Sequence, residues 1–304
     1  MTRRVGSIVT EARNEASRGI DRMSIPEIID LMQGEDRKVI AAVESVRPSI
    51  VAAIERAVQT FRGGGSLIYV GAGTSGRLGV LDAAECPPTF GTDPSMVRGI
   101  IAGGPEALRR SVEGAEDDAE AGRCAIMAER VSGIDLVIGI AASVDTPFVV
   151  GALKEAGDRR AYTILLTFNP DPRFPVQVDR VINPVTGPEI IAGSTRLKAG
   201  TATKMVLNMI TTASMIQMGK IYENLMVDLR CLSDKLRDRG RRILVELLGI
   251  DYEGADELLK GARWEVKTAI VMGKISLSYG EAKRRLEEAG GVVSAALEAR
   301  SGSR

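Results

Sequence analysis

Residues 67–78 read Leu-Ile-Tyr-Val-Gly-Ala-Gly-Thr-Ser-Gly-Arg-Leu, and this stretch decides the fold. A short apolar run rich in β-forming residues stops at glycines, and two hydroxyl side chains follow where a helix should begin. This order predicts a strand, a tight loop and a helix N-terminus. Glycine lets a ligand approach such a loop, and free amide N–H groups point outward from it. Gly73, Thr74, Ser75 and Gly76 are therefore candidate phosphate-binding residues.

The loop matches neither of two common nucleotide-binding patterns. No Gly-Lys-Ser/Thr follows, so it is not a Walker loop. Gly71, Gly73 and Gly76 do give G-x-G-x-x-G, but no acidic residue closes a second strand at the usual distance. Taken alone, this loop is equally typical of an ordinary glycine turn in an α/β protein.

Strand-like runs alternate with helical stretches along the middle of the chain. They lie at Leu67–Val70, Val97–Ile101, Leu136–Ala141, Thr163–Thr167 and Val181–Ile182. This alternation predicts an α/β fold with a mainly parallel sheet and helices on both faces, that is, a three-layer sandwich. In such sheets ligands bind outside the carboxyl ends of the strands, where the glycine loop falls.

The helical patterns on either side of the sheet suggest three parts. Residues 1–62 are expected to form a helical N-terminal segment, whose apolar positions recur at helical spacing. Residues 63–248 hold the strands and trailing helices, and we expect the phosphate site of the glycine loop there. After Gly249 the pattern changes to short helices, so residues 249–304 are expected to form a small helical domain.

Composition excludes several classes of protein. The 304 residues contain 40 Lys+Arg and 40 Asp+Glu, which argues against nucleic acid and anionic membranes as partners. No apolar run reaches eighteen residues, and the start of the chain lacks the apolar core of a secretory signal. Three cysteines without C-x-x-C spacing do not suggest a disulfide framework. We therefore expect a cytoplasmic protein.

The chain contains no histidine. This removes the commonest general base, the Ser-His-Asp and Cys-His pairs, and the usual zinc ligand sets. Carboxylates are the best remaining candidates for proton transfer, and we expect neither a metal nor a cofactor.

Two further hydroxyl-bearing clusters join the glycine loop. Ser143 and Thr146 follow the third strand-like run, and Thr146 is placed to cap a helix that starts with Pro147. Ser194 and Thr195 precede a long helix, where they could cap it or bind a ligand. Lys198 offers a cationic partner for a phosphate. Several such loops at strand ends favour a shared anion pocket over ordinary βα loops.

Glu85 and Glu116 are the candidate acid/base residues. Pro87-Pro88 should end the helix at or near Glu85, which would place this carboxylate at a helix C-terminus. Glu116 lies in an acidic patch, for which a solvated helix face is the alternative interpretation.

Five motifs in order resemble those of the N-acetylmuramic acid 6-phosphate etherase family. They are Gly-Ala-Gly-Thr-Ser-Gly-Arg-Leu-Gly (71–79), Glu-Cys-Pro-Pro-Thr (85–89), Glu-Gly-Ala-Glu-Asp (113–117), Gly-Ser-Thr-Arg-Leu-Lys-Ala-Gly-Thr-Ala (193–202) and Asn-Leu-Met-Val-Asp (224–228). The resemblance covers nearly the whole chain. It implies a sugar-isomerase (SIS) fold and a homodimer.

The resemblance also implies a reaction. Water and N-acetylmuramic acid 6-phosphate would give N-acetylglucosamine 6-phosphate and D-lactate, in amino-sugar recycling from peptidoglycan. By motif match Glu85 takes the role of proton donor and Glu116 that of the second catalytic residue. Which glutamate acts as acid and which as base at each step stays open.

The second cluster departs from the family. Relatives usually have Ser-Gly-Arg-Thr-Pro where this chain has Ser143-Val144-Asp145-Thr146-Pro147. A β-branched Val tolerates positive φ poorly, and Asp replaces a cation near a phosphate. We expect either that Asp145 points away from the phosphate or that substrate affinity is reduced.

A helix from residue 75 to 85 would rise roughly 15 Å. A sugar phosphate is too short to span this distance, so Glu85 is expected to serve the phosphate site of the partner subunit. Two other functions remain open on the sequence: a SIS-fold sugar-phosphate isomerase, and a regulatory protein that senses a sugar phosphate. A sensor can lose the acid/base pair, whereas both glutamates are present here.

Overall fold

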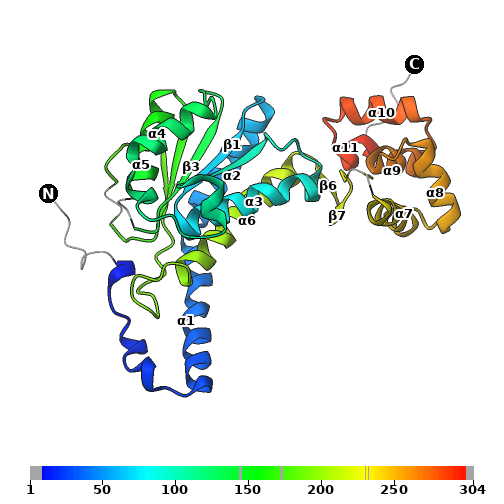
Figure 1. The fold of residues 1–304 in the computed structure, drawn as a ribbon. Coiled ribbons are helices and arrows are strands. Elements are labelled where there is room, and N and C mark those ends of the chain that lie inside the picture. Colours follow the sequence, from blue (N-terminus) through cyan, green and yellow to red (C-terminus); the bar gives the residue numbers. More distant parts are fainter. Residues whose placement is uncertain (1–8, 144–145, 172–173, 230, 232, 299–304) are drawn as a thin grey trace. The chain divides into compact units, whose positions relative to one another are not determined.

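The computed structural model describes residues 9–143, 146–171, 174–229, 231 and 233–298. The chain divides into two compact units (Figure 1). The first, here called the sheet unit, comprises Met1–Ala84 and Pro94–Thr211; the second, the helical unit, comprises Glu85–Asp93 and Thr212–Arg304. This division differs from the boundaries at 62/63 and 248/249 that the sequence suggested.

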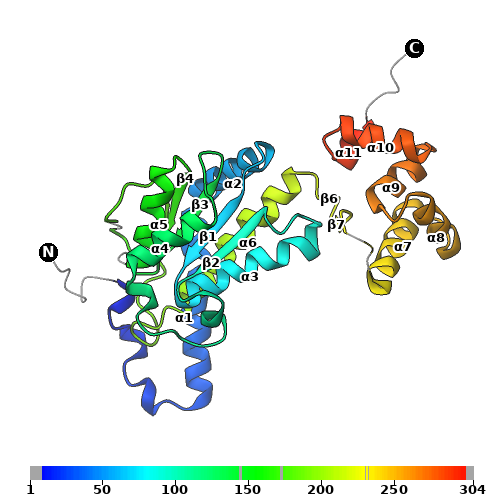
Figure 2. The same ribbon diagram turned by 45° about the horizontal axis from the view of Figure 1, so that its top comes forward.

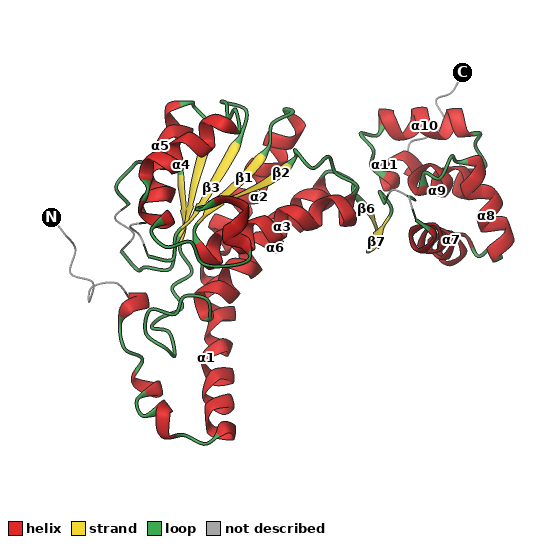
Figure 3. Ribbon diagram, viewed as in Figure 1, coloured by secondary structure: helices red, strands yellow, loops and turns green. Residues whose placement is uncertain are grey.

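Five parallel strands form the sheet of the first unit, as the alternating pattern predicted (Figure 3). They are β1 (Leu67–Gly71), β2 (Val97–Ile101), β3 (Leu136–Ile140), β4 (Tyr162–Leu166) and β5 (Arg180–Ile182). Their order is β2-β1-β3-β4-β5, with Gly71 paired to Ile101 on one side and Ile140 on the other. The direction of strand addition reverses beside β1, and such a switch point is where parallel sheets bind ligands.

Helices cover both faces of this sheet (Figure 2). α4 (Ala119–Ala128) and α5 (Pro147–Asp158) pack on one face, in a core that includes Ile68, Val70 and Leu165. α3 (Gly73–Phe90) packs on the other, where a Cβ built at Gly79 would lie 2.8 Å from the Cβ of Tyr69. The expected three-layer α/β sandwich is confirmed.

Glycines set how closely α3 approaches the sheet. A Cβ at Gly76 would lie 2.6 Å from the carbonyl oxygen of Gly71, and one at Gly99 would lie 2.6 Å from the Cα of Val80. No other residue leaves room for backbone at these distances. The close packing fixes the start of α3 directly above the end of β1.

Two helices precede the sheet, α1 (Ile25–Ser45) and α2 (Arg47–Arg62). Ser24 and Glu27 form a capping box at the start of α1, with Pro26 in its first turn. α2 contacts strands β1, β3 and β5. The helical segment expected before residue 63 is therefore present, and its second helix belongs to the sandwich.

The prediction that Pro87-Pro88 end the helix near Glu85 is wrong. α3 continues through both prolines to Phe90. Proline φ is compatible with a helix, so the helix can continue, although each proline lacks an N–H donor and its ring crowds the carbonyl four residues earlier. The helix ends instead at Gly91, where φ is +62° and the amide N–H donates to the carbonyl of Pro87 at 2.9 Å.

The helical unit combines Glu85–Asp93, which include the last turns of α3, with the chain from Thr212 onward. α6 (Lys198–Gln217) leads to a short antiparallel hairpin, β6 (Ile221–Tyr222) and β7 (Leu225–Met226). Five helices follow: α7 (Asp234–Leu248), α8 (Tyr252–Gly261), α9 (Val266–Ile275), α10 (Tyr279–Glu288) and α11 (Val293–Glu298).

Four short helices, α8 to α11, follow Gly249, and they share their core with the helix before it. Ile243 and Leu244 of α7 share one hydrophobic core with Leu259 of α8 and Ile270 of α9. α7 therefore belongs with the helices that follow it. Within the part of the chain that the structure describes, no helix combines the length and apolar character needed to span a membrane.

Candidate functional site

The glycine loop between β1 and α3 forms one wall of a pocket of about 190 Å³ in the sheet unit. Gly73 begins α3 with φ +52°, a conformation that favours glycine, and it is exposed. The first amide N–H groups of a helix have no partner within it, and the helix dipole adds partial positive charge there. The loop therefore offers an anion site at the carboxyl end of β1.

Glu116 lies at the same pocket. It belongs to a single turn of 3₁₀-helix, Ala115–Asp117, which follows Gly114 at φ +72°. Glu113 and Glu116 line the pocket together with Gly73 and Arg77, and both glutamates are exposed. The structure thus brings one predicted acid/base residue to the predicted phosphate loop.

Arg77 is a pocket residue that the sequence reasoning did not single out. It lies one helical turn after Gly73 in α3, and it makes no ion pair with any described residue. The position four residues after the loop glycine was the available signal, because i and i+4 side chains share a helix face. Its guanidinium can pair with two oxygens of a phosphate.

The start of α6 adjoins the glycine loop. A Cβ at Gly200 would lie 3.5 Å from Cγ2 of Thr74, which is ordinary van der Waals contact. Ser194 and Thr195 are half-buried in the turns just before α6. The first and third clusters of the sequence are therefore neighbours in space.

Neither Ser194 nor Thr195 caps α6 in the described contacts. Glu189 does so: it is fully buried, and its carboxylate accepts from the amide N–H of Lys198 at 3.0 Å and of Ala199 at 2.9 Å. A carboxylate at this end of a helix is favoured by the dipole. The hydroxyls of Ser194 and Thr195 are left for other partners.

Lys198, a predicted phosphate-binding residue, is held in a buried ion pair. Its side chain is 1% exposed and its Nζ lies 2.6 Å from Oε2 of Glu35 in α1, which is 3% exposed. Asn14 donates to the same carboxylate oxygen at 2.9 Å and to the carbonyl of Pro188 at 3.2 Å. This cluster fastens α1 and the N-terminal segment to the loop before α6.

The cluster sets the charge state of Glu35. Burial alone would raise the pKa of this carboxyl, but hydrogen bonds from Lys198, Lys38 and Asn14 outweigh burial and lower the pKa to about 2. Sequence reasoning had no means to find Glu35, because its partner Lys198 is remote in the chain.

The second cluster follows β3, the strand beside β1. Thr146 is the residue before α5, as expected, but its side chain makes no capping hydrogen bond. Its backbone carbonyl accepts instead from the amides of Val149 and Val150 at 3.0 Å. Ser143 is half-buried. Val144 and Asp145, with the expectation about the orientation of Asp145, lie outside the described residues.

Glu85 is exposed on α3. Of the site residues that the sequence predicted, Gly73 and Glu116 line this pocket. The others are not among its lining residues: Thr74, Ser75, Gly76, Glu85, Ser143, Thr146, Ser194, Thr195 and Lys198. The structure therefore brings Glu116 to the glycine loop within the sheet unit, whereas Glu85 belongs to the helical unit.

A family model and three curated relatives match this chain. Residues 49–156 match the glucokinase regulatory protein N-terminal SIS domain. Proteins named N-acetylmuramic acid 6-phosphate etherase are 48% identical in Serratia proteamaculans, 51% in Salinibacter ruber and 50% in Geobacillus thermodenitrificans. Each alignment covers 96% of this chain, and 99%, 94% and 99% of the relatives, respectively.

Solved structures show a weaker likeness. Phosphoheptose isomerase from Neisseria gonorrhoeae is 18% identical, with a TM-score of 0.49 over 62% of this chain and 98% of that chain. The similarity to the curated relatives, over nearly the full length of both partners, is what decides the family.

Proposed function

This chain belongs to the N-acetylmuramic acid 6-phosphate etherase family of carbon–oxygen lyases, and from that premise we propose its reaction. It cleaves the D-lactyl ether of N-acetylmuramic acid 6-phosphate with water. The products are N-acetylglucosamine 6-phosphate and D-lactate, and the pathway is the recycling of peptidoglycan amino sugars in the cytoplasm.

The pocket at the glycine loop is the observation that carries this proposal. It combines an anion-binding helix start, the guanidinium of Arg77 and the carboxylate of Glu116. A phosphate at the loop would set the rest of a sugar phosphate within reach of a proton-transferring group. An arrangement of this kind suits acid/base chemistry on a phosphorylated sugar.

The proposed phosphate site draws on three loops. It comprises Gly73, Thr74, Ser75, Gly76, Ser143, Thr146, Ser194, Thr195 and Lys198. The loops after β1 and β3 flank the switch point of the sheet, and the contact of Thr74 with Gly200 adds the start of α6. Lys198, held by Glu35, would contribute by fixing the third loop and by its positive charge.

The proposed chemistry is elimination followed by hydration. Ring opening exposes an aldehyde that acidifies the proton on C2. A glutamate removes that proton, a C2–C3 double bond forms, and the C3–O bond breaks as lactate leaves with a proton from the acid. Water then adds its hydroxyl to C3, and C2 regains a proton. Glu85 and Glu116 are the proposed pair, and one group can serve as base and then acid.

We propose that the active site is shared in a homodimer. α3 runs without interruption from Gly73 to Phe90, and the ten residues from Ser75 to Glu85 rise roughly 15 Å. α1 presents exposed apolar side chains at Ile25, Ile29 and Ile40, as a helix that packs against a second copy would. Glu85 of one subunit would then serve the phosphate loop of the other.

Mixed dimers test the sharing. A Glu85→Ala chain and a Ser75→Ala chain are each expected to be inactive. In a mixed dimer with shared sites, one site carries both changes and the other carries none, so activity returns. No recovered activity in mixed dimers would show that each site uses its own subunit's Glu85.

Isotopic water tests the chemistry itself. With H₂¹⁸O, elimination and hydration place ¹⁸O on C3 of the amino sugar and leave the lactate oxygens unlabelled. In D₂O the product gains deuterium at C2. Label in the lactate hydroxyl instead would mean direct attack on the lactyl carbon and would contradict the proposed steps.

A further inference from the structure

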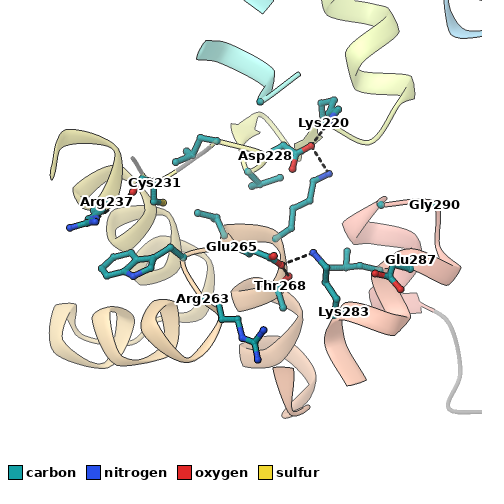
Figure 4. Close-up of a pocket in the computed structure, with 18 residues that line it drawn as sticks. Lys220, Asp228, Cys231, Arg237, Arg263, Glu265, Thr268, Lys283, Glu287 and Gly290 are labelled. Atoms are coloured by element: carbon teal, nitrogen blue, oxygen red, sulfur yellow. Dashed lines mark hydrogen bonds and ion pairs between the residues drawn. The ribbon is translucent and has the colours of Figure 1, made fainter. Parts of the chain in front are cut away.

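The helical unit contains a cavity of about 810 Å³ that the proposed reaction does not use (Figure 4). All its lining residues belong to this unit. Its floor is apolar, with Val227, Leu229, Trp264 and Leu286. This volume is in the range of pockets that hold small molecules.

The motif at residues 224–228 builds one wall of this cavity. Its first residues form the turn and second strand of the β6–β7 hairpin, and Val227 and Asp228 follow directly. Gly91 abuts the wall, because a Cβ there would lie 1.9 Å from the carbonyl oxygen of Asp228. The motif therefore has a structural setting of its own, in the helical unit.

Positive charge exceeds negative charge around the cavity. Its cations are Lys220, Lys267, Lys283, Arg237 and Arg263, and its carboxylates are Asp228, Glu265 and Glu287. The net charge of the lining is +2 in a chain whose net charge is zero. Such a local excess raises the concentration of anions.

One unit of this positive charge lies at Asp228, which forms ion pairs with two lysines. Its Oδ2 lies 2.7 Å from Nζ of Lys220 and 3.1 Å from Nζ of Lys267 (Figure 4). One carboxylate thus balances two ammonium groups. A Cβ at Gly291 would lie 3.8 Å from Nζ of Lys267, so the side of this ammonium next to Gly291 carries no side chain.

Burial makes the positive charge of Lys267 unfavourable when no anion is bound. The side chain of Lys267 is 13% exposed, and burial lowers its pKa although Asp228 acts in the opposite direction. Three other cations of the cavity already have a partner, and Arg237 lies over the ring of Trp264 at 4.8 Å from its centroid. Lys283 pairs with Glu265 at 2.8 Å, and Arg263 lies over the ring of Tyr279 at 4.4 Å from its centroid. Lys220 and Lys267 are therefore the groups that an anion would neutralise.

We propose that this cavity binds a phosphate monoester of a small metabolite, with its phosphate on Lys220 and Lys267. Phosphate is the anion that fits best, because a dianion can accept from both ammonium groups while Asp228 stays in place. The apolar floor beside Trp264 would contact the organic part. The proposal rests on residues of the helical unit alone and does not rest on the proposed reaction.

The single tryptophan of the chain makes the test specific. Trp264 lines the cavity and is the single tryptophan of the sequence, so tryptophan emission comes from a side chain in the wall of this cavity. Inorganic phosphate, glucose 6-phosphate and D-lactate are titrated separately into the full chain at constant ionic strength. The expected result is a saturable change with both phosphate compounds, tighter with the ester, and none with lactate.

Variants locate the site. Lys267→Met is expected to weaken binding by about tenfold or more, since it removes a charged hydrogen-bond donor. Lys274→Met is the matched control, because Lys274 is exposed on the same helix and does not line the cavity. Lys220→Met gives a second test if Lys267→Met fails to fold by circular dichroism.

Three results would overturn the proposal. The first is no saturable change in emission with either phosphate compound. The second is that Lys267→Met and Lys220→Met bind phosphate as tightly as the original chain does. The third is a response to lactate as strong as that to phosphate. If the original chain binds phosphate in this cavity but releases no D-lactate from N-acetylmuramic acid 6-phosphate, the proposed reaction fails and the proposed cavity site stands. The two proposals can therefore fail separately.

Discussion

Replacing Glu35 by Gln strands a buried charge, and the structure gives the size of the effect. Glu35 and Lys198 are 3% and 1% exposed and form an ion pair at 2.6 Å. Removing one partner of such a pair typically costs about 3–5 kcal/mol. The lowering of the Glu35 pKa from 4.5 to about 2 corresponds to roughly 3 kcal/mol by linkage. We therefore expect Glu35→Gln to lower the free energy of unfolding by about 3 kcal/mol at pH 7.

The sign of the pH dependence follows from the lowered pKa. A carboxyl that is more acidic in the folded state adds stability above its unfolded pKa of 4.5, and this stability is lost as pH falls toward 2. The original chain and Glu35→Gln should therefore differ in free energy of unfolding by the whole expected amount at pH 7 and by less at pH 4. Chemical unfolding followed by circular dichroism measures both values.

Two controls separate the ion pair from a general effect. Glu44→Gln, at an exposed position of the same helix, is expected to change stability by less than about 0.5 kcal/mol. In a Lys198→Met background, Glu35→Gln should cost much less, because no charge is then stranded. A cost below about 1 kcal/mol, or the same cost in both backgrounds, would refute the reasoning.

Three further predictions concern the candidate site and the packing of the sheet unit. Glu116→Gln should reduce kcat at least a hundredfold, whereas Glu55→Gln, at an exposed position of α2, should leave it unchanged; equal rates would remove Glu116 from the chemistry. Arg77→Leu should raise KM for the sugar phosphate about tenfold or more, measured by steady-state kinetics, and an unchanged KM would place the phosphate elsewhere. Gly122→Ala should destabilise by about 1–3 kcal/mol in chemical unfolding, because its Cβ would lie 2.0 Å from a backbone oxygen of α5. Gly157→Ala has open space and should be neutral or stabilising, and equal effects of the two changes would contradict this account.

The sheet was predictable because its signals are local. Each strand is a short apolar run, and the loop after β1 is recognisable in the sequence from three glycines within six residues, Gly71, Gly73 and Gly76. The parallel arrangement then places the loops after β1 and β3 at one edge without further information. β2 is the other parallel neighbour of β1, and Glu116 lies in the segment after β2, so Gly73 and Glu116 meet at the same edge.

The end of α3 and the cap of α5 could not be predicted, because more than one residue or backbone group near each helix end could take that role. Pro87 ended the expected helix, yet the stop lies at Gly91, where positive φ and a backbone hydrogen bond end α3. Thr146 had the right type and place for a capping side chain, but its backbone carbonyl alone closes the first turn.

Side-chain partners that are distant in the chain could not be predicted either, because many residues of the right type are available to each group. Glu189 caps α6 where Ser194 was the local candidate, and Glu35 pairs with Lys198 from a helix more than 160 residues away. Ile243 of α7 joins the core of the later helices because its apolar face has partners there. Only the folded chain shows which of several acceptable partners each group takes.

The most direct test of the account is D-lactate release from N-acetylmuramic acid 6-phosphate, with Glu85→Ala measured beside the original chain. The account predicts lactate from the original chain and none above background from the variant. Saturable binding of the sugar phosphate without lactate release would contradict it and would favour a regulatory protein that senses the sugar phosphate. Release that Glu85→Ala leaves undiminished would keep the reaction and remove Glu85 from it.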